Sequence, residues 1–391
     1  MITYEQALEI IKTNTHLLEA ERVEMMKSLN RVLREDVLSD MNMPPFDKSA
    51  MDGYACRRED IANELEVVET IQAGYLPKFE VGKNQCAKIM TGAMIPKGAN
   101  CVIIVEEVER ISEYRIKFKK DKTPDNICYL GEDVVKGQKL ISEGTRITEK
   151  EIASLALTGC VEPVVSIKPK IGIITTGDEI VEPNNIPQQS QIRNTNAFQL
   201  IAQCEGFGCI AKYYGIVKDT EEEISSAIIK AKQECDLILL TGGVSMGEYD
   251  LVPAVLKRTG FELLFEKVAV QPGKPTVFGK CENTFVFGMP GNPVSSFIVF
   301  EFFVKEFLAG FMGLKNYYKT LSLKMAFDFK RKRNERLARV PVKINTDGKV
   351  EAIEYHGSAH ISALAFADGI ISIPIGVSEI KKGTIVSVRQ I

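Results

Sequence analysis

The alternation of short apolar runs with longer amphipathic segments between residues 169 and 317 most constrains this fold. Runs such as 171–174 and 236–240 are typical of strands that are buried on both faces. Segments such as 219–234 have the length and apolar spacing of helices, and acids occupy the first turn of that one. Strands and helices that alternate in this way form a parallel sheet covered by helices on both faces. We therefore predict a three-layer α/β domain over residues 169–317.

The pattern changes on either side of this region. Residues 3–38 read as helix that begins at a capping box, Thr3 to Gln6. Four β-rich runs separated by turns predict a small β domain, at 65–71, 86–90, 101–105 and 115–119. A short helix over 152–157 resembles the first segment, and residues 320–391 hold only short β-runs. The predicted organisation is multidomain α/β plus β, with a split helical linker domain (1–48 and 135–168), an inserted β domain (49–134), the α/β domain (169–317) and a C-terminal β domain (318–391).

Charge and composition exclude several classes of function. The net charge is −3, from 49 basic and 52 acidic side chains, so no nucleic-acid role is expected without a local basic stripe. The densest candidate is the run 330–339, which Asn334 and Glu335 interrupt. The most apolar stretch, 294–311, contains three charged residues, so no membrane span is expected. Nine cysteines without a C-x-x-C pair, and no cleavable signal at the N-terminus, predict reduced thiols in the cytoplasm.

The supply of histidine limits the chemistry further. Only three histidines occur, at positions 16, 356 and 360, so a histidine-built zinc site or a serine–histidine hydrolase is poorly supplied. His356 and His360 have a metal-like spacing, but Gly357 and Ser358 between them would break the helix that aligns them. We therefore look for a site that is built from other groups.

Three loops of the α/β domain carry unusual chemistry for simple connections. They are 175–179, 241–250 and 289–293, and each follows a predicted strand. In an open parallel sheet, ligands bind beyond the carboxyl ends of the strands, where these loops should meet. Glycine allows the main chain to approach a phosphate closely, and helix N-termini favour anions. Each loop alone is ordinary turn sequence, but three of them predict an anion site.

The acids in and near these loops indicate a cation. Asp178, Glu179, Asp219, Glu248 and Asp250 would repel a phosphate unless a positive ion lay between them. Mg²⁺, which prefers oxygen ligands and bridges carboxylate and phosphate, is the predicted cofactor.

Lysines and a second set of loops extend the candidate site. The turn 271–275 is rigid and fixes where Lys274 lies, whereas Lys267 precedes it in an extended run. Each lysine alone is as well explained as a solvated charge. In the inserted domain, the polar loop 45–55 and the turn 88–93 could face a ligand, although from the residues alone ordinary structural turns are the default interpretation.

Six motifs in order along the chain resemble the molybdopterin molybdenumtransferase family, which is related to the E domain of gephyrin. They are Phe46-Asp-Lys-Ser-Ala-Met-Asp-Gly-Tyr-Ala55, Ile89-Met-Thr-Gly-Ala93, Thr175-Thr-Gly-Asp-Glu179, Thr241-Gly-Gly-Val-Ser-Met-Gly247, Pro272-Gly-Lys-Pro275 and Met289-Pro-Gly-Asn-Pro293. The resemblance covers nearly the whole chain. It implies a transferase that inserts molybdate into adenylyl-molybdopterin with release of AMP. It also implies a homodimer in which the inserted domain of one subunit faces the cleft of the other.

The resemblance also implies which residues act. It places catalytic roles on Asp52, Thr91, Glu179 and Asp250, and Mg²⁺ on Asp178, Glu179 and Asp250. Substrate contacts are expected at Asp133, Thr176, Gly177, Asp178, Asp219, Gly242, Gly243, Ser245, Lys267, Lys274, Pro290, Gly291, Pro293, Arg339 and Ser358. One departure is Gln271, where the family often has lysine, so this contact brings no charge. Molybdopterin adenylyltransferase and molybdoenzyme chaperones are the implied partners.

Two other functions remain open from the sequence. The same α/β module occurs in molybdopterin adenylyltransferases, which are often a lone domain of well under half this length. It also occurs in a clustering scaffold, which would need a long disordered linker. The flanking domains favour the metal-inserting step over both alternatives.

Overall fold

The computed structural model describes residues 1–243, 251–353 and 360–391. The chain divides into two compact units, which we call the larger and the smaller unit. The larger unit consists of Met1–Glu35, Glu143–Glu149 and Glu162–Ile391, and the smaller unit of Asp36–Ser142 and Lys150–Val161. Within the described ranges, no helix is long and apolar enough to cross a bilayer. The predicted boundaries of the four domains stay a prediction.

A six-stranded sheet forms the centre of the larger unit, in the order β16-β13-β17-β21-β20-β18. Its strands are β13 (Lys170–Thr176), β16 (Ile210–Val217), β17 (Leu237–Thr241), β18 (Glu262–Phe265), β20 (Val277–Cys281) and β21 (Thr284–Met289). The first four strands of that order are parallel, as the sequence predicted. The expectation of a wholly parallel sheet is wrong, because β20 and β18 run antiparallel. Only Glu282 and Asn283 separate β20 from β21, and so short a turn can join only antiparallel strands.

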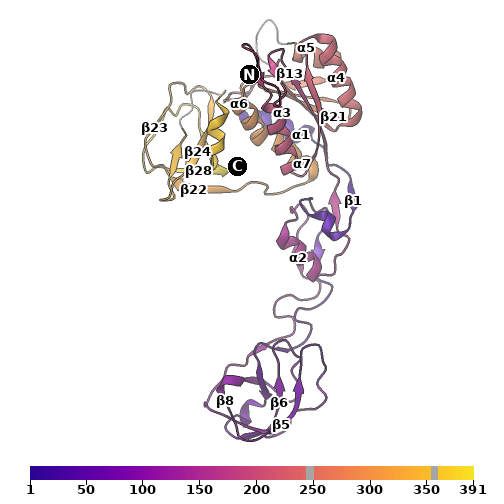
Figure 1. Cartoon of the computed structure of the whole chain (residues 1–391), viewed down its shortest axis with the longest axis vertical. Helices are drawn as coiled ribbons and strands as arrows, with labels where there is room; N and C mark the ends of the chain where they lie inside the picture. Colours follow the sequence, from indigo (N-terminus) through magenta and orange to yellow (C-terminus); the bar gives the residue numbers. More distant parts are fainter. Residues whose placement is uncertain (244–250, 354–359) are drawn as a thin grey trace. The chain divides into compact units, whose positions relative to one another are not determined.

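Helices cover both faces of this sheet (Figure 1). One face packs against α3 (Asn196–Gly206), α6 (Pro293–Val299), α7 (Lys305–Met312) and α1 (Tyr4–Asn14). The other packs against α4 (Glu221–Glu234) and α5 (Val252–Arg258). Successive strand residues point to opposite faces, so Ile173 enters the first core and Ile174 the second. The predicted helix over 293–308 is confirmed; it continues to Met312 through a π-helical segment, Phe300–Val304.

The first helix is shorter than predicted. Its capping box is confirmed, because the amide of Gln6 donates to Thr3 Oγ1 at 3.2 Å and the amide of Thr3 donates to Gln6 Oε1 at 2.9 Å. However, α1 ends at Asn14, so the helix expected over 3–38 is wrong beyond that point. The side chains of Thr13, Asn14 and Thr15 donate to carbonyls four residues earlier, and such bonds compete with helical ones. The helix instead packs on α7.

A second sheet of the larger unit comes mainly from the end of the chain. Its order is β19-β24-β26-β28-β22, with β25 beside β24. The strands are β19 (Val270–Gln271), β22 (Thr320–Lys324), β24 (Leu337–Ile344), β25 (Val350–Ala352), β26 (Gly369–Ile373) and β28 (Ile385–Gln390). Because β19 precedes the turn that carries Lys274 and pairs with β24, this turn is fixed against the C-terminal sheet.

Short pairs of strands complete the larger unit. They are β1 (Ala20–Arg22) with β12 (Val164–Ser166), β14 (Ile180–Val181) with β15 (Ile192–Arg193), and β23 (Phe329–Lys330) with β27 (Glu379–Ile380). The pair β14–β15 follows the first glycine turn directly, so it limits how far that turn can move.

The smaller unit is built on a six-stranded sheet of order β7-β4-β6-β5-β9-β8. Its strands are β4 (Gly53–Cys56), β5 (Glu64–Ile71), β6 (Gln85–Ile89), β7 (Cys101–Ile104), β8 (Val108–Arg110) and β9 (Arg115–Phe118). Short pairs join β3 (Lys48–Ser49) to β10 (Ile127–Cys128) and β2 (Val37–Leu38) to β11 (Lys139–Ile141). The four predicted strands of this region are confirmed, as is its helix α2 (Glu149–Leu157), whereas β4 and β8 were not predicted.

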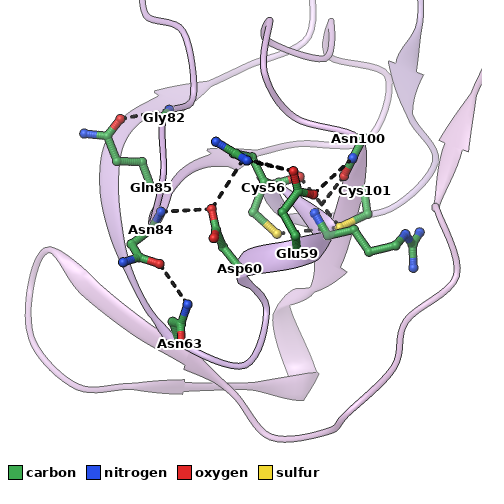
Figure 2. A network of polar contacts seen from close by, with 11 residues as sticks. Cys56, Glu59, Asp60, Asn63, Gly82, Asn84, Gln85, Asn100 and Cys101 are labelled. Carbon is green, nitrogen blue, oxygen red and sulfur yellow. Dashed lines mark hydrogen bonds and ion pairs between the residues drawn. The ribbon is translucent and has the colours of Figure 1, made fainter.

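Polar contacts and a pair of thiols hold one end of this sheet (Figure 2). The amide of Asn84 donates to Asp60 Oδ2 at 3.0 Å, and Asn63 Nδ2 donates to Asn84 Oδ1 at 2.9 Å. Cys56 and Cys101 are cross-strand partners whose Sγ atoms lie 3.7 Å apart, and both are free thiols. The hydrogen bond between them, together with burial, raises the pKa of Cys56. Both thiols are buried in the apolar core of this sheet, where they pack as small apolar side chains.

Candidate functional site

Three glycine turns meet at the carboxyl ends of β13, β17 and β21, and we call Gly177, Gly242, Gly243 and Gly291 the glycine edge. Gly242 has φ +99°, and a Cβ at this position would lie 2.4 Å from the carbonyl oxygen of Thr176. A Cβ on Gly291 would lie 3.8 Å from the Cα of Gly242. The amide of Gly242 also donates to the Met289 carbonyl of the third turn at 3.4 Å, so the turns lie against one another, and a side chain at position 242 would push two of them apart.

Asn196 connects two of these turns, although the sequence analysis did not single it out. Its Nδ2 donates to Thr241 Oγ1 and to the carbonyl oxygen of Gly291, both at 2.8 Å. The side chain is buried, and its Oδ1 has no hydrogen-bond partner. A buried carboxamide with one unused acceptor at a strand end is a group that can receive a donor from a ligand. The signal in the sequence was an asparagine at the start of a helix, which is too common to stand out.

Two acids of the first turn lie close to Asp219, which follows β16. The amide of Asp219 donates to Asp178 Oδ1 at 3.4 Å. Partial burial raises the pKa of Asp219, and the charges of Asp178 and Glu179 raise it further. Asp178 and Glu179 therefore lie near enough to Asp219 for their charges to act on it.

A cation site at this edge would depend on these neighbouring carboxylates. Within residues 1–243, 251–353 and 360–391, no three acids, cysteines or histidines lie close enough together to hold a metal ion. However, Mg²⁺ commonly uses only one or two carboxylates and takes its other ligands from phosphate and water. Asp178 and Glu179 can supply these one or two carboxylates. Asp250, the third predicted ligand, and Ser245 lie outside the described residues.

A cavity of about 700 Å³ lies between the turn of Lys274, the third glycine turn and the C-terminal sheet. Half of its lining residues are basic or polar, and none is acidic; the lining consists of Gln271, Pro272, Gly273, Lys274, Pro275, Pro290, Asn292, Ser295, Phe329, Lys330, Arg331, Arg336, Ala338, Arg339, Val340 and Ile353. Of the predicted contacts, Lys274, Pro290 and Arg339 meet here. Gln271 lines the same cavity, so the departure from the family's lysine falls on its wall.

The basic run 330–339 supplies much of this wall, and its members differ in what they can offer a ligand. Arg331 donates to the carbonyls of Val377, Arg336 and Pro374, and Lys330 pairs with Glu379 at 3.2 Å. Arg336 donates one bond, to the carbonyl of Val270. Among the described residues, neither Lys274 nor Arg336 is in an ion pair, so both can bind an anion. The sequence analysis noted the run but did not connect it to the loops.

Three other predicted contacts are placed differently or not described. Lys267 is not part of the cavity wall; its carbonyl accepts the amide of Ile2 at 3.1 Å, and the amide of Val268 donates to the carbonyl of Lys274 at 3.0 Å. Pro293 begins α6 and shapes the third turn. Ser358 lies outside the described residues.

In the smaller unit, the structure brings Asp52 and Thr91 together. Thr91 donates to Asp52 Oδ1 twice, from its amide at 2.7 Å and from its hydroxyl at 3.1 Å. Both side chains are exposed. Asp133, the other acid predicted in this unit, is also exposed and lies on a separate turn, where its amide donates to the carbonyl of Met43. The carboxylate of Asp52 is therefore oriented but uncovered in its own unit.

The fold and these groups define a class of protein: an α/β protein with a glycine-lined sheet edge beside a cavity whose charged lining residues are all basic. Comparison with known families agrees. Residues 2–159 match the MoeA N-terminal region (domain I and II), residues 172–310 a probable molybdopterin binding domain, and residues 322–391 the MoeA C-terminal region (domain IV).

Curated relatives and solved structures point the same way. The chain is 36% identical over 346 residues to molybdopterin molybdenumtransferase of Haemophilus influenzae, with 85% of each chain covered. It is 33% identical over 377 residues to that of Staphylococcus epidermidis, covering 94% of this chain and 90% of the relative. The molybdopterin biosynthesis moeA protein of Pyrococcus horikoshii matches all of both chains, with a TM-score of 0.86 and 32% identity. The chain belongs to the molybdopterin molybdenumtransferase family.

Proposed function

We propose that this protein inserts molybdate into adenylyl-molybdopterin, forming the molybdenum cofactor and releasing AMP. One observation carries the proposal: a single loop joins the two parts of the site. The amide of Gly242 at the glycine edge donates to the Met289 carbonyl of this loop at 3.4 Å, while Pro290 and Asn292 of the same loop line the cationic cavity. A ligand with a phosphoanhydride at the edge would therefore extend toward an oxyanion in the cavity.

The side chains of the site suggest a division of roles. Main-chain amides of the glycine edge and the Asn196 carboxamide would hold and orient the adenylyl end of the substrate. Lys274 and Arg336 would hold the molybdate dianion through charge-assisted hydrogen bonds. Asp178 and Glu179, with Asp250, would hold Mg²⁺, which supplies positive charge to the phosphoanhydride and makes AMP a better leaving group.

We further propose that the protein acts as a homodimer in the cytoplasm. Asp52 and Thr91, exposed in the smaller unit, would complete the site of the second subunit and orient the reacting oxygen or the cation. Molybdopterin adenylyltransferase would supply the substrate, and molybdoenzyme chaperones would receive the product. The adenylyltransferase and scaffold alternatives are not favoured, because the relatives that match along most of the chain are named molybdenumtransferases.

The test is AMP release by purified protein supplied with adenylyl-molybdopterin, Mg²⁺ and molybdate. Glu179→Gln removes one negative charge at the same size, and we expect it to lower the rate by about 1,000-fold, in the range found when a group that stabilises the transition state is removed. Glu222→Gln, at an exposed position in the first turn of α4, is the matched control and should keep the wild-type rate.

Two results would contradict the proposal. Release of AMP by Glu179→Gln at the wild-type rate would remove Glu179 from the mechanism. Consumption of ATP with free molybdopterin, without dependence on molybdate, would instead indicate the adenylating reaction.

A further inference from the structure

One face of the C-terminal sheet is polar although much of it is buried. Arg339 on β24 is paired with Ser372 on β26, and Thr320 on β22 is paired with Arg389 on β28. Ser387 lies two residues before Arg389 and so faces the same side. The opposite face carries Val340, Ile371, Val388 and other members of an apolar core. Polar side chains therefore lie on this face of all four strands, β22, β24, β26 and β28.

This polar face closes a small cavity against the α/β part of the larger unit. The cavity has a volume of about 300 Å³; the buried Ile370 of β26 lies among the polar groups of the sheet, and the other wall is formed by Tyr4, Phe302 and Tyr318. Volumes of this size lie at the lower end of those of ligand sites, which run from about 300 to 1,000 Å³. Ser372, Ser387 and Thr320 are exposed, so the cavity opens to solvent along their side.

The two arginines of this cavity are buried, unlike its serine and threonine residues. Arg339 is 6% exposed and Arg389 8%. The Cζ atom of Arg339 lies 3.9 Å from the ring centre of Phe302 and 4.3 Å from that of Tyr4. The Cζ atom of Arg389 lies 4.5 Å from the ring centre of Phe302 and 4.3 Å from that of Tyr318. Both guanidinium groups therefore lie against the ring of Phe302, and the pKa of Arg339 is lowered by burial and further by the nearby charge of Arg389.

Little in the protein balances these charges. Arg339 donates to the Ser372 hydroxyl, but Arg339 Nε, Arg389 Nε and Arg389 Nη2 have no hydrogen-bond partner. In the part of the chain that the structure describes, neither arginine is in an ion pair. Glu306 is engaged by Lys12 at 3.3 Å and by the Tyr317 hydroxyl at 2.6 Å. Contact with aromatic rings offsets only part of the free energy of burying two cations, since each such contact contributes about 0.5–2 kcal/mol.

We propose that this cavity binds a small tetrahedral oxyanion of the phosphate, sulfate or molybdate class between Arg339 and Arg389. An oxyanion supplies the missing negative charge and accepts the unused N–H donors, and arginine suits such ligands because its donors are coplanar. The hydroxyls of Ser372 and Ser387 bind the oxyanion from the mouth of the cavity. The site is separate from the Lys274 cavity: Arg339 borders both, but its guanidinium group stacks on rings that line the small one.

The experiment measures thermal stability of the full chain in phosphate, sulfate or molybdate against chloride at equal ionic strength. Lys274→Met is the background, so that the larger cavity loses one of the two basic side chains proposed to hold an anion there. At a concentration of about ten times the Kd, we expect the melting temperature to rise by about 3 °C. Comparing the three anions shows which ligand the cavity takes. A preference for molybdate indicates a second substrate site, and a response to phosphate or sulfate indicates a general anion site.

A variant assigns the effect to this cavity without removing a buried arginine. Ser387→Asp places a carboxylate beside Arg389, so it should raise the melting temperature in chloride and weaken anion binding at least tenfold. Thr384→Asp, in the turn before β28 and outside the cavity, is the matched control and should respond to anions like its parent. Equal melting temperatures in anion and chloride, or an unchanged anion response in Ser387→Asp, would overturn the proposal.

Discussion

The glycine edge of the larger unit and the Asp52–Thr91 pair of the smaller unit present their polar groups in opposite ways. At the edge, three turns lie against one another, Asn196 links two of them, and a Cβ on Gly242 would have no room. The Asp52–Thr91 pair is held by its own two hydrogen bonds and is exposed. Packing between the turns therefore shapes the glycine edge, whereas the two hydrogen bonds orient the Asp52–Thr91 pair.

This difference bears on how each region can be tested. A packed edge tolerates no added atom, so small substitutions there should change both stability and activity. An exposed pair tolerates substitution, so changes there should alter activity while the fold remains. Four predictions, taken from the largest expected effect to the smallest, test this contrast.

Gly242→Ala should have the largest effect. The new Cβ would lie 2.4 Å from the Thr176 carbonyl at φ +99°, and with about 1–3 kcal/mol of strain the melting temperature should fall by about 5 °C and AMP release should cease. Gly215→Ala is the matched control: its φ is +89°, but no atom lies within 4 Å of the added Cβ. If calorimetry gave equal falls in melting temperature for both variants, backbone strain, and not contact between the turns, would explain the effect of Gly242→Ala.

Lys274→Met should lower the rate of AMP release by about 100-fold while the protein stays folded, because a charge-assisted bond to the oxyanion contributes about 1.5–3 kcal/mol. Lys267→Met is the control, since Lys267 is not part of the cavity wall. Its rate should stay within about threefold of wild type. Steady-state kinetics at varied molybdate would separate the two, and a larger loss at position 267 would reverse the assignment.

Mixing two inactive variants should show whether the exposed pair serves another subunit. Asp52→Asn and Lys274→Met each damage one part of the site, but a mixed dimer would keep one intact site. After subunit exchange, about a quarter of the wild-type activity should return, since half of the dimers are mixed and each has one good site of two. Activity that stayed at the level of the separate variants would contradict a shared site.

The smallest expected effect is that of Asp219→Asn on stability. Because the folded state raises the pKa of Asp219, its contribution to stability is present below the unfolded pKa and is lost as the pH rises through the folded pKa. The variant should therefore melt about 1 °C higher than wild type at pH 7, a small gain since solvent screens this carboxylate, and no higher below about pH 4. Asp121→Asn, exposed in the smaller unit, is the control. A gain at low pH would contradict the sign.

Much of the fold was predictable because its signals are local. The apolar run at 237–241 and the acid-capped helix at 221–234 are where the spacing predicted them. The antiparallel strand β20 was missed because its run follows a proline-rich turn and is separated from β21 by only two residues. The first helix was overextended because Leu17 and Leu18 continue the apolar spacing, while the three side chains that end it do so through bonds that spacing does not reveal.

By itself, the sequence determined which chemical groups this protein owns: glycine turns after buried strands, acids beside them, and a rigid turn that carries Lys274. Only the tertiary structure decided which of them meet. It put Arg336 with Lys274, set Asn196 between two turns, and enclosed Arg339 with Arg389 against aromatic rings. The physical reason is that strand order and register bring together residues 45 to 95 positions apart, and no local pattern of side chains encodes that pairing.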